Sequence, residues 1–300
     1  MKYRNFGKFD FKPSALGFGV MRLPLVREGA PESEIDEKKA TEMLYFAIDN
    51  GVNYLDTAYV YHKGQSEVFL GKILTKNYRE KVKIASKLSL WNTENKNDPD
   101  KLLEEQLRRL RTDQIDFYLL HGLNKERWEK VKNLEIIEWA GKKIAEGKIG
   151  HLGFSFHDEY SLFQEIVDSY DKWTFCQIQY NFLDENFEAG TKGLKYASQK
   201  GLGVVVMEPL RGGKLANPPR EVKEIWNKAE PTRTPVDWAL QWLWNQPEVS
   251  LVLSGMSSLE QVKENIGSAD RSKVNSLTPA ELMVFGQVKQ EYTHLTRILQ

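Results

Sequence analysis

Short runs of apolar and β-branched residues alternate along the chain with longer stretches in which apolar residues recur every three or four positions. The first pattern predicts buried β-strands and the second predicts amphipathic helices, so the alternation favours parallel βα units. Helices are expected around residues 36–50, 66–76, 99–111, 126–146, 158–170 and 187–200. Eight runs fit the strand pattern, at residues 15–19, 53–56, 82–87, 115–121, 149–155, 175–180, 203–208 and 250–254.

The junctions between helices and strands repeat a single device. Gly51, Gly147 and Gly201 each follow a predicted helix, and a strand begins almost at once. Glycine readily takes the left-handed conformation that closes a helix. Eight strands with helices between them favour a closed (β/α)8 TIM barrel, because an open doubly wound sheet would need a nucleotide-binding glycine fingerprint after its first strand. Gly17-Phe18-Gly19 is followed by neither a third glycine nor a helix.

Three segments depart from the repeat. Residues 1–14 are predicted to form a β-hairpin with Gly7-Lys8 at its turn, capping the bottom of the barrel. Residues 209–233 are predicted to form a long loop, which in a compact domain is usually functional or mobile. Residues 278–300 are predicted to form an additional helix lying across the barrel. Although the length of 300 residues permits two domains, the strand count favours one domain over residues 1–300.

Composition narrows the function. Lysine and arginine together number 42, as do aspartate and glutamate, and the formal net charge is zero. This balance argues against nucleic acid or an anionic membrane as the partner, and the hydrophobic fraction of 41% argues against a disordered chain. We find neither a signal-peptide core nor an apolar run long enough to span a membrane, and we therefore expect a cytoplasmic protein. Balanced charge gives no signal for the oligomeric state.

The chain has one cysteine, Cys176. A single cysteine forms no internal disulfide, no cysteine-based zinc site and no cysteine-ligated iron–sulfur cluster. Any redox chemistry is therefore expected to depend on a bound organic cofactor, with no metal. Cys176 directly precedes Gln177 on a predicted strand.

Polar residues at the carboxyl ends of barrel strands face the mouth where active sites form. Asp56, Lys87 and His121 end predicted strands, and Tyr61 lies in the loop after Asp56. Taken singly, each is more often a structural or solvated residue. Together they suggest reduction of a C=O bond. The lysine would stabilise a phenolate and lower the tyrosine pKa from about 10, the aspartate would keep the lysine charged, and the histidine would polarise the carbonyl.

Reduction of a carbonyl also needs a hydride donor, and an organic donor that carries phosphate groups needs a phosphate-binding site on the protein. The residues Ser254-Gly255-Met256-Ser257-Ser258 follow the eighth strand, where the last loops of such barrels commonly bind phosphate. Arg211 and Lys214 in the long loop are candidates to close over a pyrophosphate, although solvent exposure explains them equally well.

Several motifs occur in order along the chain, most of them at predicted strand ends. They are Leu16-Gly17-Phe18-Gly19, Asn53-Tyr54-Leu55-Asp56-Thr57-Ala58, Tyr61, Gly64-Gln65-Ser66-Glu67, Ala85-Ser86-Lys87, Asp116-Phe117-Tyr118-Leu119-Leu120-His121, Gly153-Phe154-Ser155 and Gly255-Met256-Ser257-Ser258 leading to Glu264-Asn265. From about residue 1 to residue 268 the chain resembles the aldo-keto reductase superfamily. The resemblance implies a (β/α)8 barrel that reduces aldehydes and ketones with NADPH, or less often with NADH.

The resemblance also implies roles for single residues. Tyr61 would be the general acid, Lys87 and Asp56 would tune it, and His121 would orient the substrate. Ser155 and Gln177 would hydrogen-bond the carboxamide of the nicotinamide, and Cys176, next to Gln177, is then expected to pack beside the cofactor site. The remaining expected cofactor contacts are Met21, Met207, Pro209, Leu210, Arg211, Lys214, Gly255, Ser257, Gln261, Glu264 and Asn265.

The sequence departs from the family pattern in three places. Phe156 follows Ser155 where many members have asparagine, and Met207 stands where many have a tyrosine stacked on the nicotinamide. Gly255 and Gln261 stand where some branches have the lysine and arginine that bind the 2′-phosphate, which leaves the choice between NADPH and NADH open. The departures resemble a microbial branch whose longer members carry a C-terminal ferredoxin-like iron–sulfur extension, which we expect to be absent here.

Two alternatives to a reductase remain. One is a cofactor-binding regulatory or sensor subunit with little turnover, similar to the potassium-channel β-subunits. The other is the barrel part of an electron-transfer oxidoreductase whose iron–sulfur module lies elsewhere. For the reductase, we expect the substrate to be a small or medium-sized carbonyl compound, with a pocket wall formed by Met21, Tyr59, His62, Trp91 and Leu123.

Overall fold

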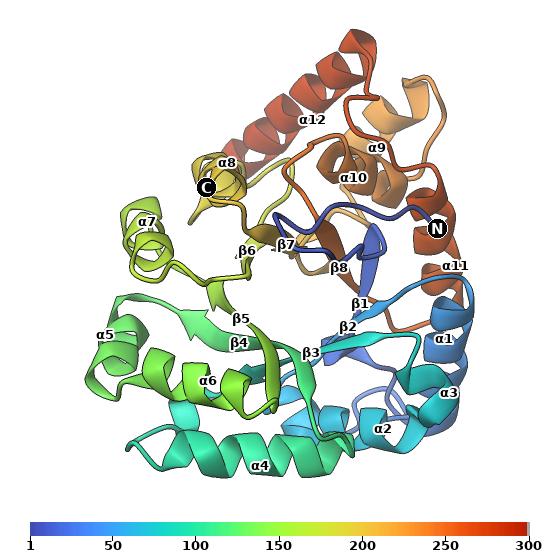
Figure 1. The fold of residues 1–300 in the computed structure, drawn as a ribbon. Helices are drawn as coiled ribbons and strands as arrows, with labels where there is room; N and C mark the ends of the chain where they lie inside the picture. The colour runs from blue at the N-terminus through green and yellow to red at the C-terminus, as the bar shows by residue number, and fades with distance from the viewer. Residues whose placement is uncertain (299–300) are drawn as a thin grey trace.

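The computed structural model describes residues 1–298, and its eight strands form a closed parallel barrel in the order in which they follow along the chain (Figure 1). Every neighbouring pair, including the first and the last strand, is parallel. The predicted barrel is thus confirmed, and each strand end lies within two residues of the expected position. The strands are β1 Leu16–Gly19, β2 Tyr54–Asp56, β3 Lys83–Leu88, β4 Ile115–Leu123, β5 Ile149–Phe156, β6 Phe175–Gln179, β7 Gly203–Met207 and β8 Leu251–Gly255.

Helices surround the barrel on its outer side (Figure 1). The α-helices are α1 Glu37–Asp49, α2 Gln65–Ile73, α3 Lys76–Arg79, α4 Asp98–Leu110, α5 Lys125–Asn133, α6 Ile136–Ala145, α7 Tyr160–Asp168, α8 Gly190–Gln199, α9 Arg220–Lys228, α10 Pro235–Trp244, α11 Leu259–Asp270 and α12 Pro279–Ile298. Short 3₁₀ turns lie in loops at the mouth, at η1 Val20–Arg22, η2 Tyr61–Gly64, η3 Leu90–Asn92 and η4 Arg211–Gly213. No helix in the described part of the chain is long and apolar enough to cross a membrane.

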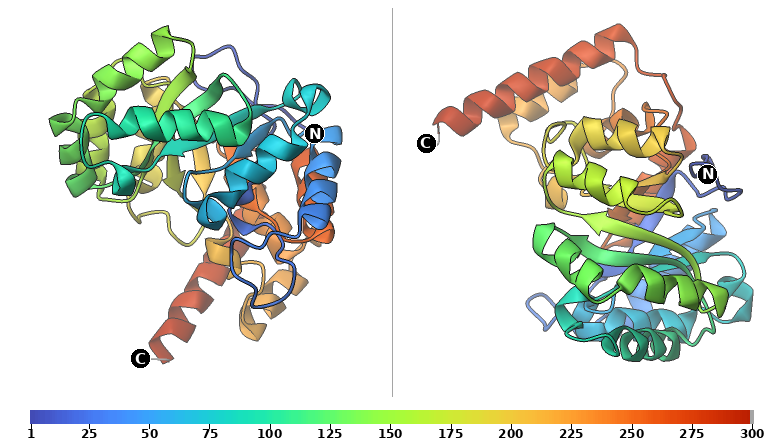
Figure 2. Two further views of the ribbon diagram at one scale, coloured as in Figure 1. Left: turned by 90° about the horizontal axis from the view of Figure 1, so that it is seen from below. Right: turned by 60° about the vertical axis from the view of Figure 1, so that its left-hand side comes forward.

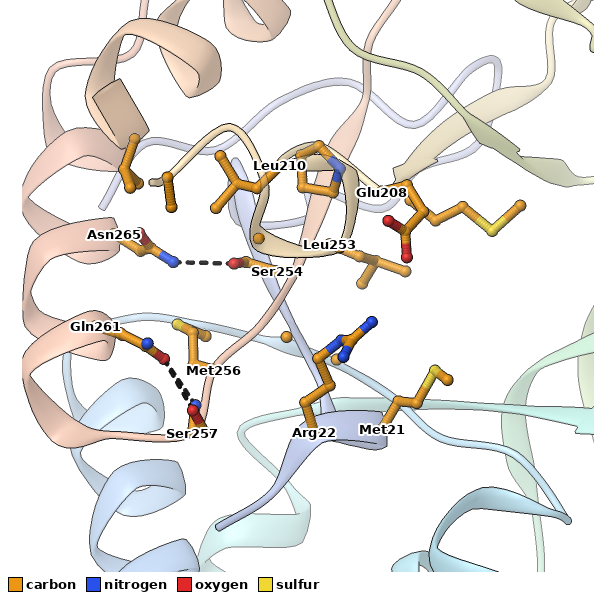
Figure 3. Close-up of a pocket in the computed structure, with 18 of the residues that line it drawn as sticks. Met21, Arg22, Glu208, Leu210, Leu253, Ser254, Met256, Ser257, Gln261 and Asn265 are labelled. Carbon is orange, nitrogen blue, oxygen red and sulfur yellow. Dashed lines mark hydrogen bonds between the residues drawn. The ribbon is translucent and has the colours of Figure 1, made fainter. Parts of the chain in front are cut away.

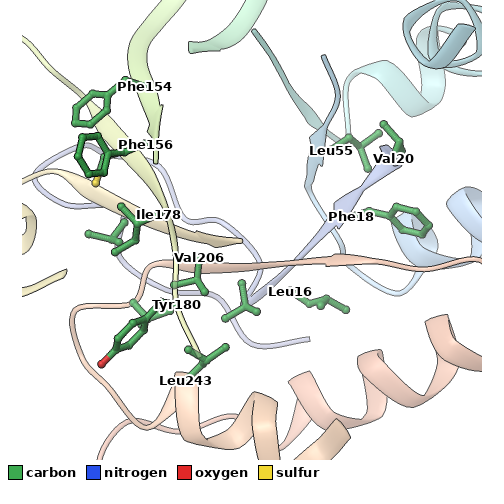
Figure 4. Close-up of a cluster of buried hydrophobic side chains, with 14 of the residues drawn as sticks. Leu16, Phe18, Val20, Leu55, Phe154, Phe156, Ile178, Tyr180, Val206 and Leu243 are labelled. Carbon is green, nitrogen blue, oxygen red and sulfur yellow. The ribbon is translucent and has the colours of Figure 1, made fainter. Parts of the chain in front are cut away.

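Side chains on the two faces of each strand enter different cores, as the two-residue period of a strand requires. Leu16, Phe18 and Val20 point outward into the large core between the strands and the helices (Figure 4). The barrel interior is filled by a separate cluster from several strands, which includes Tyr54, Phe117 and Phe175. The carboxyl ends of the strands are therefore left to polar residues at the mouth.

The N-terminal segment closes the bottom of the barrel as predicted. Antiparallel bridges join Tyr3 to Ser14 and Phe6 to Phe9, with the turn at Gly7 and Lys8. The Phe6 ring is fully buried against Phe117 and Phe175 inside the barrel. At the helix–strand junctions Gly51, Gly147 and Gly201 have φ of +93°, +76° and +80°, which confirms the left-handed helix ends.

Three expectations about helices were wrong. The predicted helix 126–146 is two helices, α5 and α6, because Glu135 adopts a left-handed φ of +56° between them. The predicted loop 209–233 contains α9, whose Val222 and Trp226 are buried. Helix α12 lies outside the barrel beside α9 instead of across it (Figure 2), because its buried Phe285 packs on Trp226 and Trp238.

Candidate active site

The barrel mouth brings Asp56 of β2 and Lys87 of β3 into a buried ion pair. The Lys87 ammonium donates to Asp56 Oδ1 at 2.6 Å and to the carbonyl of Thr57 at 2.7 Å. The two side chains are only 1% and 4% exposed. The ring of Tyr61, from η2, lies with its centroid 4.7 Å from the same ammonium. The lysine thus has a carboxylate on one side and the aromatic ring of Tyr61 on another.

His121 completes the group of four predicted residues. Its imidazole ring lies edge-on to Tyr61 at a centroid distance of 6.0 Å and edge-on to Trp91 at 4.8 Å. Its Nδ1 atom is buried without a hydrogen-bond partner. This arrangement leaves Nε2 as the ring nitrogen that is free to meet a ligand. The structure therefore brings together all four residues that the sequence placed at strand ends and in the following loop.

The electrostatics of the site correct one expectation. Burial raises the pKa of Tyr61 above its ordinary value, and the favourable field of Lys87 only partly opposes this rise. The lowered tyrosine pKa expected from the sequence takes account of the lysine alone, whereas in the fold the loss of water around the phenol has the larger effect. For Lys87 itself, burial lowers the pKa, but the attraction of Asp56 and Tyr61 together, with their hydrogen bonds, outweighs burial and raises it. At neutral pH Lys87 is thus an ammonium and Tyr61 a neutral phenol.

His121 is the opposite case. Burial lowers its pKa well below the ordinary value of 6.5, and the positive charge of Lys87 lowers it further. His121 is therefore an uncharged imidazole at neutral pH. A neutral imidazole with its proton on Nε2 is a hydrogen-bond donor that adds no charge to the site.

A cleft of about 340 Å³ leads away from Asp56 between the ends of β1, β7 and β8 (Figure 3). Most of the residues predicted to contact the cofactor line it. These are Met21, Gln177, Met207, Pro209, Leu210, Gly255, Ser257, Gln261, Glu264 and Asn265. Hydrogen bonds fix its outer end, where Asn265 donates to Ser254 Oγ at 2.9 Å and the Ser257 amide donates to Gln261 Oε1 at 2.8 Å.

Three predicted cofactor contacts do not line this cleft. The guanidinium of Arg211 turns away to Asp184 at 3.2 Å, and Lys214 is exposed beyond the cleft. Ser155 is buried and accepts a hydrogen bond from the amide of Gly122 at 2.7 Å, although its strand places it directly beside Gln177. Loop residues such as Arg211 are hard to place from sequence because their direction depends on distant partners.

Of the residues predicted to line the substrate pocket, some lie at the mouth and others point elsewhere. Trp91 is 49% exposed at the mouth and contacts His121, as expected of a pocket wall. Leu123 is wholly buried in the outer core, so its prediction was wrong. Tyr59 points outward and donates to Glu105 at 2.8 Å. His62 is buried, with Nε2 accepting from the Leu23 amide at 3.3 Å and Nδ1 beside the Glu32 carbonyl at 2.6 Å, and it therefore links two loops.

Arg22 and Glu208 are cleft residues that the sequence argument missed. Figure 3 shows the Arg22 side chain pointing from η1 towards the β7 loop. Its aliphatic part packs over Gly255, where a Cβ atom would lie 3.3 Å from Arg22 Cδ. The only sequence signal for Arg22 is that it directly follows Met21, which is one of the expected cofactor contacts.

A family model for the Aldo/keto reductase family matches residues 15–278. The chain belongs to the aldo/keto reductase family. The solved structure of aldo-keto reductase AKR11C1 from Bacillus halodurans, in its holo form, is similar, with a TM-score of 0.78, 28% identity and 96% of each chain covered.

Two curated relatives align over most of this family member. An uncharacterized oxidoreductase of Bacillus subtilis, YqkF, is 27% identical, with 91% of this chain and 93% of the relative covered. A protein of Escherichia coli named NADH-specific methylglyoxal reductase is 26% identical, with 89% and 93% covered. Family membership makes the chain an oxidoreductase.

The single cysteine of this aldo/keto reductase lies differently from the expected position. Cys176 is fully buried in the outer core, on the face of β6 opposite to Gln177. Burial raises the pKa of its thiol far above the ordinary range. Cys176 is therefore a packing residue behind the strand and does not face the cleft.

Proposed function

We propose that this aldo/keto reductase reduces aldehyde or ketone carbonyls with a nicotinamide dinucleotide and that Tyr61 delivers the proton. One observation carries the proposal: a buried ammonium lies 4.7 Å from the centroid of a tyrosine ring and is held by a carboxylate that lines the cleft. A charged lysine at this position stabilises the phenolate that remains after proton transfer. The name of the Escherichia coli relative, a methylglyoxal reductase specific for NADH, supports the same class of reaction.

The cleft fits a nicotinamide dinucleotide. At its inner end Gln177 Oε1 is buried without a hydrogen-bond partner, and a carboxamide N–H group would satisfy it. Met207, whose sulfur lies 3.5 Å from Gln177 Nε2, would cover the nicotinamide face. Gln261, Glu264 and Asn265 would hold the adenosine end.

Arg22 is the residue that would meet the pyrophosphate. It lies between the two ends of the cleft, and in the described residues its guanidinium has no ion-pair partner within 4.0 Å. It thus replaces Arg211 and Lys214 in this proposed role. Gly19 and Gly255, at the ends of β1 and β8, line the same part of the cleft, and the aliphatic part of Arg22 covers Gly255.

A nicotinamide dinucleotide held in the cleft would supply the hydride that reduces the carbonyl carbon. Tyr61 donates its hydroxyl proton to the carbonyl oxygen, and Lys87 stabilises the resulting phenolate while Asp56 keeps the lysine charged and oriented. His121, neutral and carrying its proton on Nε2, donates a hydrogen bond to the same oxygen and orients the carbonyl. Trp91, which packs edge-on against His121, would form one wall of the substrate pocket.

The choice between NADP(H) and NAD(H) rests on the 2′-phosphate. We propose NADP(H) as the cofactor, as is usual in the family, although the outer end of the cleft presents Ser257 and Gln261 in place of cations. Fluorescence titrations with NADPH and NADH in parallel test this assignment. Tighter binding of NADPH is expected, and equal or tighter binding of NADH would contradict it.

Replacement of Tyr61 by phenylalanine tests the reaction. Tyr61→Phe should lower kcat by about 10²–10⁴-fold on a panel of small aldehydes, with the dissociation constant of the cofactor unchanged, because only the proton donor is lost. Tyr196→Phe, on the exposed face of α8, is the matched control. Normal turnover of Tyr61→Phe would show that another group donates the proton. A wild-type protein that binds cofactor tightly but reduces no carbonyl compound would favour the regulatory alternative.

A further inference from the structure

The turn that carries Tyr61 is strained. Within η2 both His62 and Lys63 adopt left-handed conformations, with φ of +50° and +52°. Residues with a Cβ atom occupy this region at a cost in free energy, and such strain persists only where the surroundings hold the chain in place. The position of Tyr61 over Lys87 therefore depends on contacts from outside the turn.

Arg109 of α4 makes these contacts. Its Nη1 atom donates to the carbonyl of Tyr59 at 3.0 Å, and its guanidinium lies 4.3 Å from the centroid of the Tyr59 ring. The same guanidinium fills the space beside Gly64, where a Cβ atom would lie 3.1 Å from Nη1. Arg109 thus contacts the turn on both sides of Tyr61, at Tyr59 and at Gly64.

Glu67 connects Arg109 to β3, the strand that carries Lys87. Its side chain is fully buried, and its Oε2 atom accepts from Arg109 Nη1 at 3.2 Å. Its Oε1 atom accepts from Ser86 Oγ and from Gln106 Nε2, both at 2.6 Å. Gln106 Nε2 also donates to the Lys87 carbonyl at 3.1 Å. One carboxylate therefore connects the Tyr61 turn, β3 and α4.

We propose that Glu67 and Arg109 are positioning residues that set the location of Tyr61 relative to Lys87. The inference rests on the proposed function, in which Tyr61 donates the proton and Lys87 stabilises the phenolate. Neither residue lines the cleft, so they act through the turn and the strand and not through the cofactor. An ionic hub with directed hydrogen bonds fixes this geometry more narrowly than apolar packing would.

Two substitutions separate positioning from simple stabilisation. Glu67→Gln keeps the size and the acceptor for Ser86 and Gln106, but it directs an NH₂ group at Arg109; Arg109→Met removes the guanidinium that contacts both Glu67 and the Tyr59 carbonyl. Each should lower kcat by about 10–100-fold, with the dissociation constant of the cofactor changed less than twofold, because misplacement of a reacting group is costly. The control is Lys72→Gln, which breaks the exposed Lys72–Glu37 pair of the same helix α2.

The titration of Tyr61 supplies a readout that does not need turnover. In protein labelled with ¹³Cζ-tyrosine, the Tyr61 resonance is identified by its loss in Tyr61→Phe. In the wild type, burial raises the pKa of Tyr61, and Lys87 opposes part of this rise. In Glu67→Gln and Arg109→Met it should rise further, and the basic limb of the kcat–pH profile should move with it.

Each outcome decides. Variants that melt at lower temperature but keep the wild-type kcat and Tyr61 titration when folded would overturn the positioning role. A displaced Tyr61 titration in a protein that reduces no carbonyl compound would support the positioning role while the proposed function fails. Loss of cofactor binding in both variants would show that Glu67 and Arg109 act on the cofactor site and not through the Tyr61 turn. This result would overturn the inference.

Discussion

Replacement of Lys87 by methionine tests the buried ion pair most directly. The substitution keeps an unbranched side chain but removes an ammonium that lies 2.6 Å from Asp56 Oδ1. At an effective dielectric constant of about 20, two unit charges at this distance attract by about 6 kcal/mol, and the desolvation of both ions offsets most of that gain. Removal of one partner leaves a buried charge uncompensated, which typically costs about 3–5 kcal/mol of unfolding free energy.

The pH dependence of this loss has a definite sign. Burial raises the pKa of Asp56 and Lys87 opposes the rise, so in Lys87→Met the folded-state pKa moves further above the unfolded value of about 3.9. A group whose pKa is raised on folding contributes stability below its unfolded pKa, and that contribution is lost as pH rises through the folded pKa. The penalty relative to the wild type should therefore be small near pH 4.5 and reach its full size at pH 7–8.

Urea unfolding at several pH values, followed by tryptophan fluorescence and far-UV circular dichroism, measures the penalty; coincident transitions establish two-state behaviour. The second variant, Asp56→Asn/Lys87→Met, replaces both charges. It should recover most of the lost stability at pH 8, and its difference in unfolding free energy from the wild type should depend little on pH. A penalty that is the same at pH 4.5 and pH 8, or that Asp56→Asn does not relieve, would refute the assignment of a mutually compensating buried pair.

Two more variants probe the rest of the site. Because burial keeps His121 neutral while the unfolded chain takes up a proton below about pH 6.5, stability should be lost as pH falls from 7 to 5, with a slope of up to about 1.4 kcal/mol per pH unit. Urea unfolding of His121→Gln should show a shallower slope, and equal slopes would argue against a neutral folded imidazole. Arg22→Leu should weaken cofactor binding about tenfold and reduce its salt dependence, because a charge-assisted contact is lost. Arg220→Leu, on the exposed face of α9, should bind normally in the same titration, and normal binding by Arg22→Leu would remove Arg22 from the pyrophosphate site.

The sequence alone was sufficient to predict the barrel and the four residues at its mouth. Strand and helix periodicities are local properties, and the glycine junctions at Gly51, Gly147 and Gly201 are local signals as well. Once strands are parallel, their carboxyl ends must meet at one face, so Asp56, Lys87 and the loop after Asp56 are placed by topology. Most cleft residues were expected from the resemblance to the aldo-keto reductase superfamily, and the structure places them where β7, β8 and the loop after β1 meet.

The tertiary structure decided matters that depend on partners distant in sequence. Tyr59 and His62 flank Tyr61 in the chain, yet one turns outward to Glu105 and the other is buried beneath the Leu23 loop. The direction of Arg22 into the cleft and of Arg211 out of it depends on the contacts available to each.

The Tyr61 pKa shows the difference between the two levels most clearly. The sequence determined which groups are present at the mouth, and from the lysine it suggested a lowered pKa. The fold determined how much water those groups lose, and desolvation outweighed the neighbouring charge. Periodicity in the chain determines where a side chain is, whereas its environment, and therefore its chemistry, is a property of the packed whole.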